Sequence, residues 1–373
     1  MKIREFAVER WMDRYENACR YNLSETCVES LTVAGLLRLA GREGSLEEAL
    51  SGLKLTYGSI PGSDLLRGRI GSLYTRQTAD NVIVTHGAIG ANALVYQALV
   101  EPGDRVVSVL PTYQQHTSIP ESLGAEVLTL RLEEGNGFLP DLDDLRKLVG
   151  GRAKLIAFSN PNNPTGSLMD WGVLQNIVSI AREAGAWILG DEVYRGIDQA
   201  GDGFTASVAD LYERGISTGS MSKVWSLAGL RLGWIAAPAE LLHMVTTHRD
   251  YNTISVGMLD DWFAALALEA RDAILARNRS IVRSNLAILD QWVNAEPAIS
   301  YVKPAAGTTA LLKYTGTEPS EDLCVRLVET AGVLFTPGSA LDIEGYVRIG
   351  YANNRTVLEE GLAQVSTFLR PSD

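Results

Sequence analysis

Cysteine is scarce in this chain of 373 residues, which has only Cys19, Cys27 and Cys324. Three is an odd number, and the spacing of these residues matches neither a disulfide framework nor the ligand pairs of a metal site. We therefore expect reduced thiols in a cytoplasmic protein, with no metal centre.

Long apolar runs are also lacking. No stretch approaches the roughly 18 apolar residues of a membrane-spanning helix, and the charged N-terminus has no apolar signal-peptide core. Lys and Arg total 33 against 45 Asp and Glu, which gives a net charge of −12. Nucleic-acid binding relies on clustered basic residues. We therefore expect neither a membrane nor a nucleic acid as partner.

The chain does contain a regular alternation of short apolar segments with helical patterns. Its hydrophobic content of 46% and its length suit a large core and two domains. The predicted strands are 81–85, 105–110, 125–130, 155–159 and 187–190, with helices at 88–99, 141–149 and 171–184. This alternation predicts an α/β fold with three layers around a mostly parallel sheet, whose ligands bind at the carboxyl ends of the strands.

The two ends of the chain follow another pattern. The predicted helices there are 1–20, 31–41, 63–75, 238–247 and 256–291, followed by strands near 309–313 and 346–351. We predict a large domain at residues 45–255. Residues 1–44 and 256–373 would form a smaller α+β domain with an interdomain helix, and the N-terminal arm would pack on that domain.

A candidate site lies in the stretch S-M-S-K-V-W-S-L-A-G-L-R-L-G-W, from Ser220 to Trp234. Lys223 can act as a Schiff-base nucleophile if burial or neighbouring positive charge keeps its amine partly unprotonated. Ser220, Ser222 and Arg231 provide hydroxyl groups and a cationic fork for a phosphate dianion. Pyridoxal phosphate, an aldehyde with a phosphate ester, needs all of these groups together. The alternative is an exposed loop lysine.

Two glycine-containing turns match the same cofactor. In T-H-G-A-I-G-A, the backbone N–H groups of Gly87, Ala88 and Ile89 would hold a phosphate at a helix N-terminus. In N-P-N-N-P-T-G, the amide of Asn163 would donate to the phenolic oxygen of the cofactor. An ordinary tight turn and a proline-rich turn are the respective alternatives.

Two further motifs place charged residues near predicted strands. In D-E-V-Y, the Asp191 carboxylate would keep a pyridine nitrogen protonated, and Tyr194 would reach the phenolic oxygen. The alternative for Asp191 is a helix cap or a surface acid. In Y-V-R-I-G-Y, Arg348 lies among apolar neighbours and needs a carboxylate partner, which is either a substrate or an internal salt bridge.

Together these motifs resemble, in the same order, those of fold type I pyridoxal-phosphate enzymes of the class I/II aminotransferase family, over nearly the whole chain. The resemblance implies that Lys223 binds the cofactor and moves the proton at Cα of an amino-acid substrate. It also implies that Tyr113 stacks on the cofactor ring, and that Arg348 and Asn163 contact the substrate. Tyr57, in Y-G-x-x-x-G, would reach the cofactor phosphate of a partner subunit, so a homodimer is expected.

An arginine that clamps the substrate carboxylate near the ring plane leaves the Cα–H bond to break, which disfavours decarboxylation. Our leading hypothesis is an amino-acid aminotransferase that works through a pyridoxamine form of the cofactor. The alternatives are an arginine-type cyclase or oxidase of natural-product biosynthesis, or a β-eliminating lyase. A transcription regulator would need a basic DNA-binding extension.

Two stretches bear on the alternatives. Arg249 to Ser255, R-D-Y-N-T-I-S, together with T-H-G, resembles the capreomycidine-synthase branch. Many family members have a glycine where this chain has Ser24-Glu25-Thr26. Glu25 would suit a cationic substrate side chain if it faces the pocket, or else it caps a helix or faces solvent. His86 and His116 are interpreted as structural.

Overall fold

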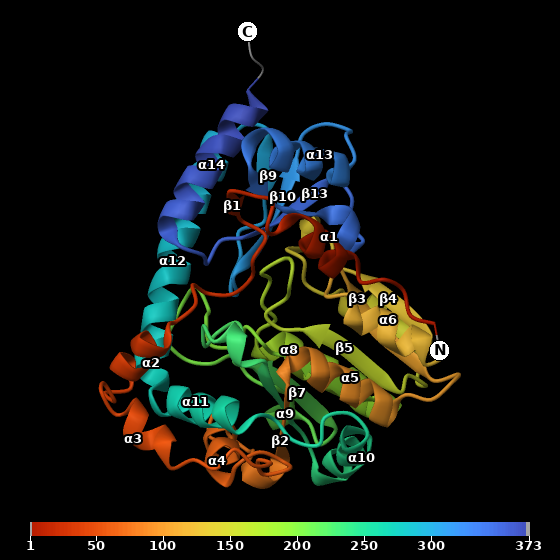
Figure 1. Ribbon diagram of the computed structural model, residues 1–373. Helices are drawn as coiled ribbons and strands as arrows, with labels where there is room; N and C mark the ends of the chain where they lie inside the picture. The colour runs from red at the N-terminus through yellow and green to blue at the C-terminus, as the bar shows by residue number, and fades with distance from the viewer. Residues whose placement is uncertain (1, 371–373) are drawn as a thin grey trace.

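The computed structural model describes residues 2–370, and it contains a seven-stranded sheet, a four-stranded sheet and a two-stranded pair (Figure 1). The large sheet has the strand order β2-β8-β7-β6-β5-β3-β4. Its strands are β2 (Val82–His86), β3 (Arg105–Leu110), β4 (Glu126–Arg131), β5 (Leu155–Ser159), β6 (Trp187–Asp191), β7 (Gly215–Ser220) and β8 (Leu232–Ala236). Strand β8 is antiparallel to both of its neighbours, β2 and β7, and the other adjacent strands of the sheet are parallel. The predicted α/β fold with a mostly parallel sheet is confirmed.

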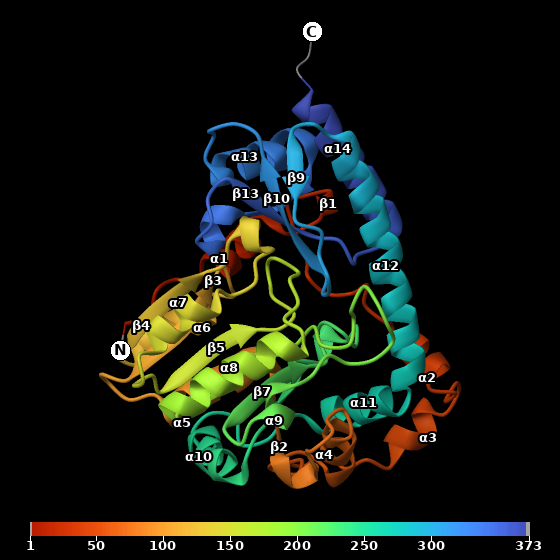
Figure 2. The same ribbon diagram turned by 180° about the vertical axis from the view of Figure 1, so that it is seen from behind.

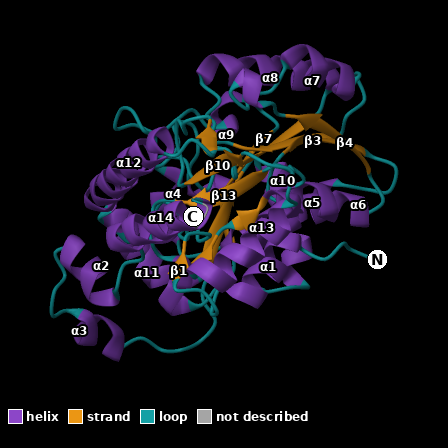
Figure 3. Cartoon of the chain, turned by 90° about the horizontal axis from the view of Figure 1, so that it is seen from above, coloured by secondary structure: helices purple, strands orange, loops and turns teal. Residues whose placement is uncertain are grey.

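Helices cover both faces of this sheet (Figure 3). One face carries α7 (Leu142–Val149), α8 (Trp171–Ala184) and α9 (Val208–Leu211), and the other carries α5 (Gly87–Leu99), α6 (Gln115–Ser122) and α10 (Ala239–Asp250). The sequence sets the ends of α8: the Asp170 side chain accepts from Val173 N at its start, and Gly185 adopts a left-handed conformation at its end. Its buried face packs on the sheet through Leu174, Ile177 and Val178. These layers leave the carboxyl ends of the parallel strands free for a site.

The four-stranded sheet lies above the seven-stranded sheet in Figure 1 and has its own helices. It is antiparallel and consists of β12 (Thr336–Pro337), β13 (Tyr346–Gly350), β10 (Thr309–Tyr314) and β9 (Ile299–Tyr301). Helices α13 (Ser320–Arg326) and α14 (Arg355–Leu369) lie beside it. The N-terminal segment joins this part, because β1 (Tyr21–Asn22) pairs with β11 (Val333–Leu334).

The predicted single helix over 256–291 is wrong. The chain forms α11 (Met258–Glu269) and then α12 (Arg271–Ala295), with Ala270 between them. Helix α12 runs from the level of the large sheet to the small one (Figure 2). No helix within residues 2–370 is both long and apolar enough to cross a membrane.

The N-terminal helices are shorter than predicted, and one was missed. They are α1 (Ala7–Tyr15), α2 (Val33–Leu39), α3 (Leu46–Ser51) and α4 (Asp64–Gly71). As expected, α1 packs on the small sheet region: the indole nitrogen of Trp11 donates to Phe335 O at 2.8 Å. It also contacts the large domain, since Ala7 N donates to the Gln114 side chain at 2.9 Å.

Strands β7 and β8 were missing from the prediction, although they flank the candidate lysine. The β7 sequence G-I-S-T-G-S contains small and hydroxyl residues instead of a continuous apolar run. It is buried throughout because neighbours approach its backbone closely. A Cβ on Gly215 would lie 2.0 Å from Val208 O, and one on Gly219 would lie 2.4 Å from the Trp234 ring. Close packing, rather than hydrophobicity, selects the glycines here.

Candidate active site

A cavity of about 330 Å³ lies between the carboxyl edge of the large sheet, the N-terminal segment and β13. This volume falls in the range typical of small-molecule sites. Most of the predicted site residues line it, although they come from segments far apart in the chain. From the cofactor set these are Ala88, Ile89, Tyr113, Asn163, Asp191 and Tyr194. The predicted lysine loop adds Ser220, Ser222, Lys223 and Arg231, and the substrate set adds Glu25 and Arg348.

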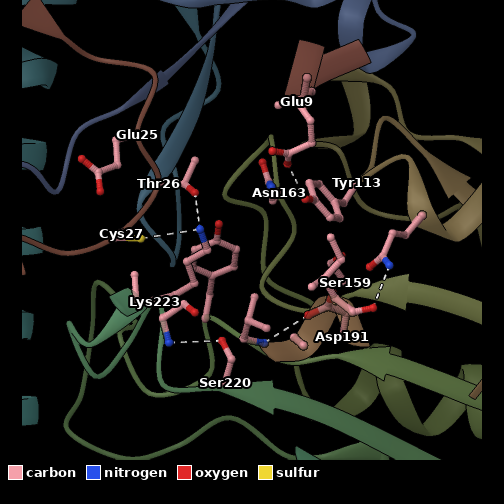
Figure 4. Close-up of a pocket in the computed structure, with 18 of the residues that line it drawn as sticks. Glu9, Glu25, Thr26, Cys27, Tyr113, Ser159, Asn163, Asp191, Ser220 and Lys223 are labelled. Atoms are coloured by element: carbon pink, nitrogen blue, oxygen red, sulfur yellow. Dashed lines mark hydrogen bonds between the residues drawn. The ribbon is translucent and has the colours of Figure 1, made fainter. Parts of the chain in front are cut away.

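Lys223 lies in the loop between β7 and β8 and faces the cavity (Figure 4). Its Nζ donates to Thr26 Oγ1 at 2.6 Å and lies 3.7 Å from Cys27 Sγ (Figure 4). It is therefore not an exposed loop lysine. Thr26 belongs to the stretch Ser24-Glu25-Thr26 named from the sequence, but neither it nor Cys27 was predicted to contact the lysine, because a contact across nearly 200 positions leaves no motif.

The charge state of Lys223 follows from the groups around it. Burial by itself would lower the pKa of Lys223, but nearby Cys27, Tyr194 and Glu25 more than offset this, so the pKa is raised. Arg348 acts in the opposite direction. The amine is thus held protonated while the cavity contains only protein groups, so these groups alone do not meet the condition for a nucleophilic lysine that the sequence set.

The N-terminus of α5 forms a cradle beside Arg231. Gly87 has a φ of 64°, and a Cβ at this position would lie 3.2 Å from Arg231 Nη2. A Cβ on Gly233 would lie 2.3 Å from the Gly87 carbonyl carbon, so glycine is required on both sides of this contact. Arg231 Nη1 lies 3.5 Å from Ser222 Oγ. Helix N–H groups, hydroxyls and a guanidinium therefore converge, which is the donor set of a phosphate site.

Asp191 is the last residue of β6 and is buried. Its Oδ2 accepts from Asn92 Nδ2 at 2.9 Å and lies 3.5 Å from His116 Nε2. Its Oδ1 accepts from Val193 N at 3.3 Å. Asp191 is thus neither a helix cap nor a surface acid. His116, interpreted as structural, is a buried neighbour of this carboxylate, and its Nδ1 bonds Tyr96 at 2.9 Å.

Tyr194 and Asn163 present polar groups to the same cavity. The Tyr194 side chain is only 1% exposed, and its hydroxyl has no hydrogen-bond partner among residues 2–370. The Asn163 side-chain oxygen accepts from Arg348 Nη1 at 3.3 Å, which leaves its amide N–H₂ available. A buried phenol without a partner is costly unless a ligand satisfies it.

Tyr113 follows β3 and lies under the N-terminal arm. Its hydroxyl donates to Glu9 Oε1 at 2.7 Å (Figure 4). Its ring centroid lies 4.7 Å from that of Phe6. Burial and the adjacent Glu9 carboxylate raise the pKa of Tyr113 well above its ordinary value. The phenol is therefore neutral. Sequence reasoning named Tyr113 but not Glu9.

Arg348 lies on β13 and is 3% exposed. Its Nη2 donates to Thr336 Oγ1 at 2.9 Å and to Ser24 O at 3.1 Å, while its Nε has no partner within the described chain. None of the described carboxylates forms an ion pair with it, which argues against the internal salt bridge. Burial lowers the pKa of Arg348, as expected for a guanidinium without a counter-ion.

Tyr57 and Glu25 differ from the other predicted residues. Tyr57 is 81% exposed and does not line the cavity of its own chain. Glu25 is exposed but lies at the cavity wall beside Thr26 (Figure 4). Gly87 does not line the cavity but lies against Arg231, whereas its neighbours Ala88 and Ile89 face the cavity.

Comparison with known proteins agrees with this geometry. The family model for aminotransferase class I and II matches residues 30–365. Capreomycidine synthase from Streptomyces vinaceus is 32% identical over 364 residues, which is 97% of this chain and 93% of that protein. An aspartate aminotransferase from Thermotoga maritima is 27% identical over 306 residues, covering 81% of this chain and 79% of that protein.

Two solved structures extend the comparison. A PLP-dependent aminotransferase from Streptococcus suis superposes with a TM-score of 0.95 at 43% identity, covering 99% of this chain and 98% of that chain. The PLP-dependent cyclase OrfR superposes with a TM-score of 0.91 at 26% identity, with coverage of 99% and 98%. The predicted family, fold and cofactor are confirmed. The protein is a pyridoxal-phosphate-dependent enzyme of aminotransferase type, and it belongs to the aminotransferase class I and II family.

Proposed function

We propose that the protein transfers the amino group of an α-amino acid to a keto acid. One observation carries this proposal most directly: Arg348 is a buried guanidinium with no acidic partner in the described chain, and it opens into the same cavity as Lys223. A substrate α-carboxylate would satisfy it, since carboxylates and guanidinium groups pair bidentately. Arg348 and Lys223 would then face the carboxylate and the Cα of one substrate.

The residues present fit pyridoxal phosphate. Lys223 would bind its aldehyde, and Asp191 would bind its ring nitrogen. Tyr194 and Asn163 would bind its phenolic oxygen, and Tyr113 would cover the ring. The phosphate would bind at Gly87, Ala88, Ile89, Ser220, Ser222 and Arg231. When bound, the cofactor supplies an electron sink that stabilises negative charge at Cα of the substrate.

The chain's own groups then determine which bond breaks. Arg348, supported by Asn163, holds the carboxylate so that it is not the leaving group. With cofactor and substrate bound, the Lys223 amine would be the base at the Cα proton. Thr26 and Cys27 lie within hydrogen-bonding range of that amine and would orient it during the transfer.

A homodimer completes the site in this proposal. Many exposed large apolar side chains come from the segment before α4, the first turn of α4 and the segments around α10 and α11. They are Leu55, Tyr57, Ile60, Leu65, Met244, Tyr251, Ile254 and Leu259. Ile60 O accepts from the buried Arg249, which joins the first of these segments to the end of α10. A second copy of the chain would cover this surface and receive Tyr57 at its phosphate cradle.

We further propose the domain division stated from the sequence, with residues 45–255 as the large domain and 1–44 plus 256–373 as the small one. A cytoplasmic location is part of the same proposal. The three cysteines are free thiols, which is the usual state in a reducing compartment.

The test is a half-reaction. Holoenzyme mixed with a panel of amino acids, without acceptor, should lose the visible absorption of the lysine-bound cofactor, and a keto acid should restore it. An Arg348→Met variant should lose at least about tenfold in apparent affinity for the amino acid, because its carboxylate loses a charged partner. Full affinity in this variant would overturn the role of Arg348.

A second candidate rests on the two cyclase-related comparisons, capreomycidine synthase and OrfR. In this alternative, deprotonation at Cα leads to ring closure, elimination or oxidation on the same scaffold. A product formed without a keto-acid acceptor, with ammonia release or O₂ uptake, would favour it over transamination.

A further inference from the structure

We infer that helix α1 selects substrates whose side chain carries a positive charge, such as an amine or a guanidinium, with Glu9 as the main specificity residue. This inference rests on the proposed function, because it needs an amino acid bound at Arg348 and Lys223. It concerns a contact that the cofactor and the α-carboxylate do not use.

Helix α1 forms part of the cavity wall. Its residues Val8, Glu9 and Met12 face the cavity, and Glu16 follows at its C-terminal end. Glu9 and Glu16 are seven positions apart, so they lie on the same side of the helix. The helix therefore presents two carboxylates with apolar groups between them, which suits an alkyl chain that ends in a cation.

The charges around the cavity do not balance without such a cation. Its acidic residues are Glu9, Glu16, Glu25 and Asp191, and its basic residues are Lys223, Arg231 and Arg348. The cofactor and the substrate carboxylate account for all three basic groups and for Asp191. None of the three glutamates forms an ion pair with a Lys, Arg or His of residues 2–370. They remain as negative charge facing the space for the substrate side chain.

Buried polar groups without a protein partner show that the same cavity receives a polar ligand. Arg348 is 3% exposed with an unpartnered Nε, and Tyr194 is 1% exposed with an unpartnered hydroxyl. Glu9 is close enough to Arg348 to act on its pKa. The carboxylate clamp and the anionic wall thus face one ligand, a combination that favours a zwitterion with an extra cation and repels a dicarboxylic acid.

Glu9 is better placed than the other two glutamates. It is half-buried, and the Tyr113 hydroxyl binds its Oε1 at 2.7 Å, so the side chain is fixed in one orientation. Glu16 and Glu25 are exposed, and solvent and salt screen their charges. The helix itself is anchored on both sides, to Phe335 by Trp11 and to Gln114 by Ala7.

A competing explanation is that Glu9 only orients the Tyr113 ring. The substitution Glu9→Gln separates the two roles, because the amide oxygen can still accept from Tyr113 while the charge is lost. Asp13→Asn is the matched control. It removes one charge from the exposed side of the same helix, where Asp13 pairs with Arg10 at 2.7 Å.

The experiment measures equilibrium dissociation constants by spectral titration of holoenzyme with L-arginine, L-ornithine, L-norleucine and L-aspartate, without acceptor. We expect arginine or ornithine to bind at least about tenfold more tightly than norleucine, and aspartate to bind more weakly still. Glu9→Gln should weaken binding of the cationic amino acid about tenfold and leave norleucine within about twofold. Asp13→Asn should change neither value.

Two results would overturn the inference: no preference for a cationic amino acid in the unmodified enzyme, or equal losses for arginine and norleucine in Glu9→Gln. If norleucine changes the cofactor spectrum and binds as tightly as arginine and ornithine, the proposed function survives and only the specificity role of α1 falls. If no amino acid changes the cofactor spectrum, both proposals fall.

Discussion

The side chain of Asn92 bridges Asp191 and Thr218: its Nδ2 donates to Asp191 Oδ2 at 2.9 Å, and its Oδ1 accepts from Thr218 Oγ1 at 2.7 Å. All three residues are buried. Asp191 is on β6 and Thr218 is on the adjacent parallel strand β7. The bridge therefore fixes the Asp191 carboxylate relative to both strands. Its orientation toward the cavity therefore depends on a residue of α5 that no motif identified.

Replacing Asn92 by Ala should weaken cofactor binding and lower stability. Asp191 Oδ2 and Thr218 Oγ1 would each lose a buried partner, at a cost of about 1–3 kcal/mol. We expect the dissociation constant for pyridoxal phosphate to rise about tenfold in a fluorescence titration. Asn176→Ala on the exposed side of α8, where the amide bonds only Gly172 O, is the control. A lowered thermal midpoint with unchanged cofactor affinity would reduce Asn92 to a packing role.

Cofactor uptake by the apoprotein should accelerate as pH rises. Burial opposes the charge on Lys223, but Cys27, Tyr194 and Glu25 outweigh this effect and raise the pKa of Lys223. The reactive neutral amine is therefore scarce at pH 7, and its population grows about tenfold per pH unit below that pKa. Cys27→Ser removes an acidic neighbour and should move the rate profile to lower pH. Stopped-flow absorbance measures both profiles. Superimposable profiles would show that Cys27 does not control the amine.

Asp198 should make stability depend on pH. Burial raises the pKa of Asp198 from 3.8 to about 6, although Arg279, Arg195 and Arg283 oppose the shift. Between these values the folded protein binds more protons at this carboxyl than the unfolded chain does, so its contribution to stability falls as pH rises. Asp198→Asn should therefore raise the thermal midpoint at pH 7.5 and have less effect near pH 4.5. A constant difference across this range, or the same profile in exposed Asp202→Asn, would contradict the assignment.

The apolar surface around Tyr57 should be an interface between copies. Tyr251 is 93% exposed, and a charged replacement there would be buried without a partner in a dimer. Tyr251→Glu should shift sedimentation from dimer toward monomer and weaken cofactor retention, whereas Tyr57→Phe should leave the dimer intact and weaken only phosphate binding. A monomeric unmodified protein that retains its cofactor would refute the shared site.

Much of the site was predictable because many of its functional residues lie in short sequence motifs at strand ends. Asp191 ends a strand, and Asn163 and Lys223 lie in the loops that follow two other strands, all at the same edge of the sheet. The supporting contacts were not predictable. Thr26, Glu9 and Asn92 reach the site through tertiary packing over separations of 197, 104 and 99 positions. Strand β7 escaped prediction because its glycines reflect close backbone contacts rather than a hydrophobic pattern.

The central claim is that Lys223 carries the cofactor at this cavity. Borohydride reduction of holoenzyme, followed by peptide mass spectrometry, tests it directly because reduction fixes the cofactor to its lysine. We predict a phosphopyridoxyl group on the peptide that contains Lys223, and loss of both the label and the visible absorption in Lys223→Ala. A label on any of the other six lysines, Lys2, Lys54, Lys147, Lys154, Lys303 or Lys313, or an unchanged spectrum in the variant, would contradict the account.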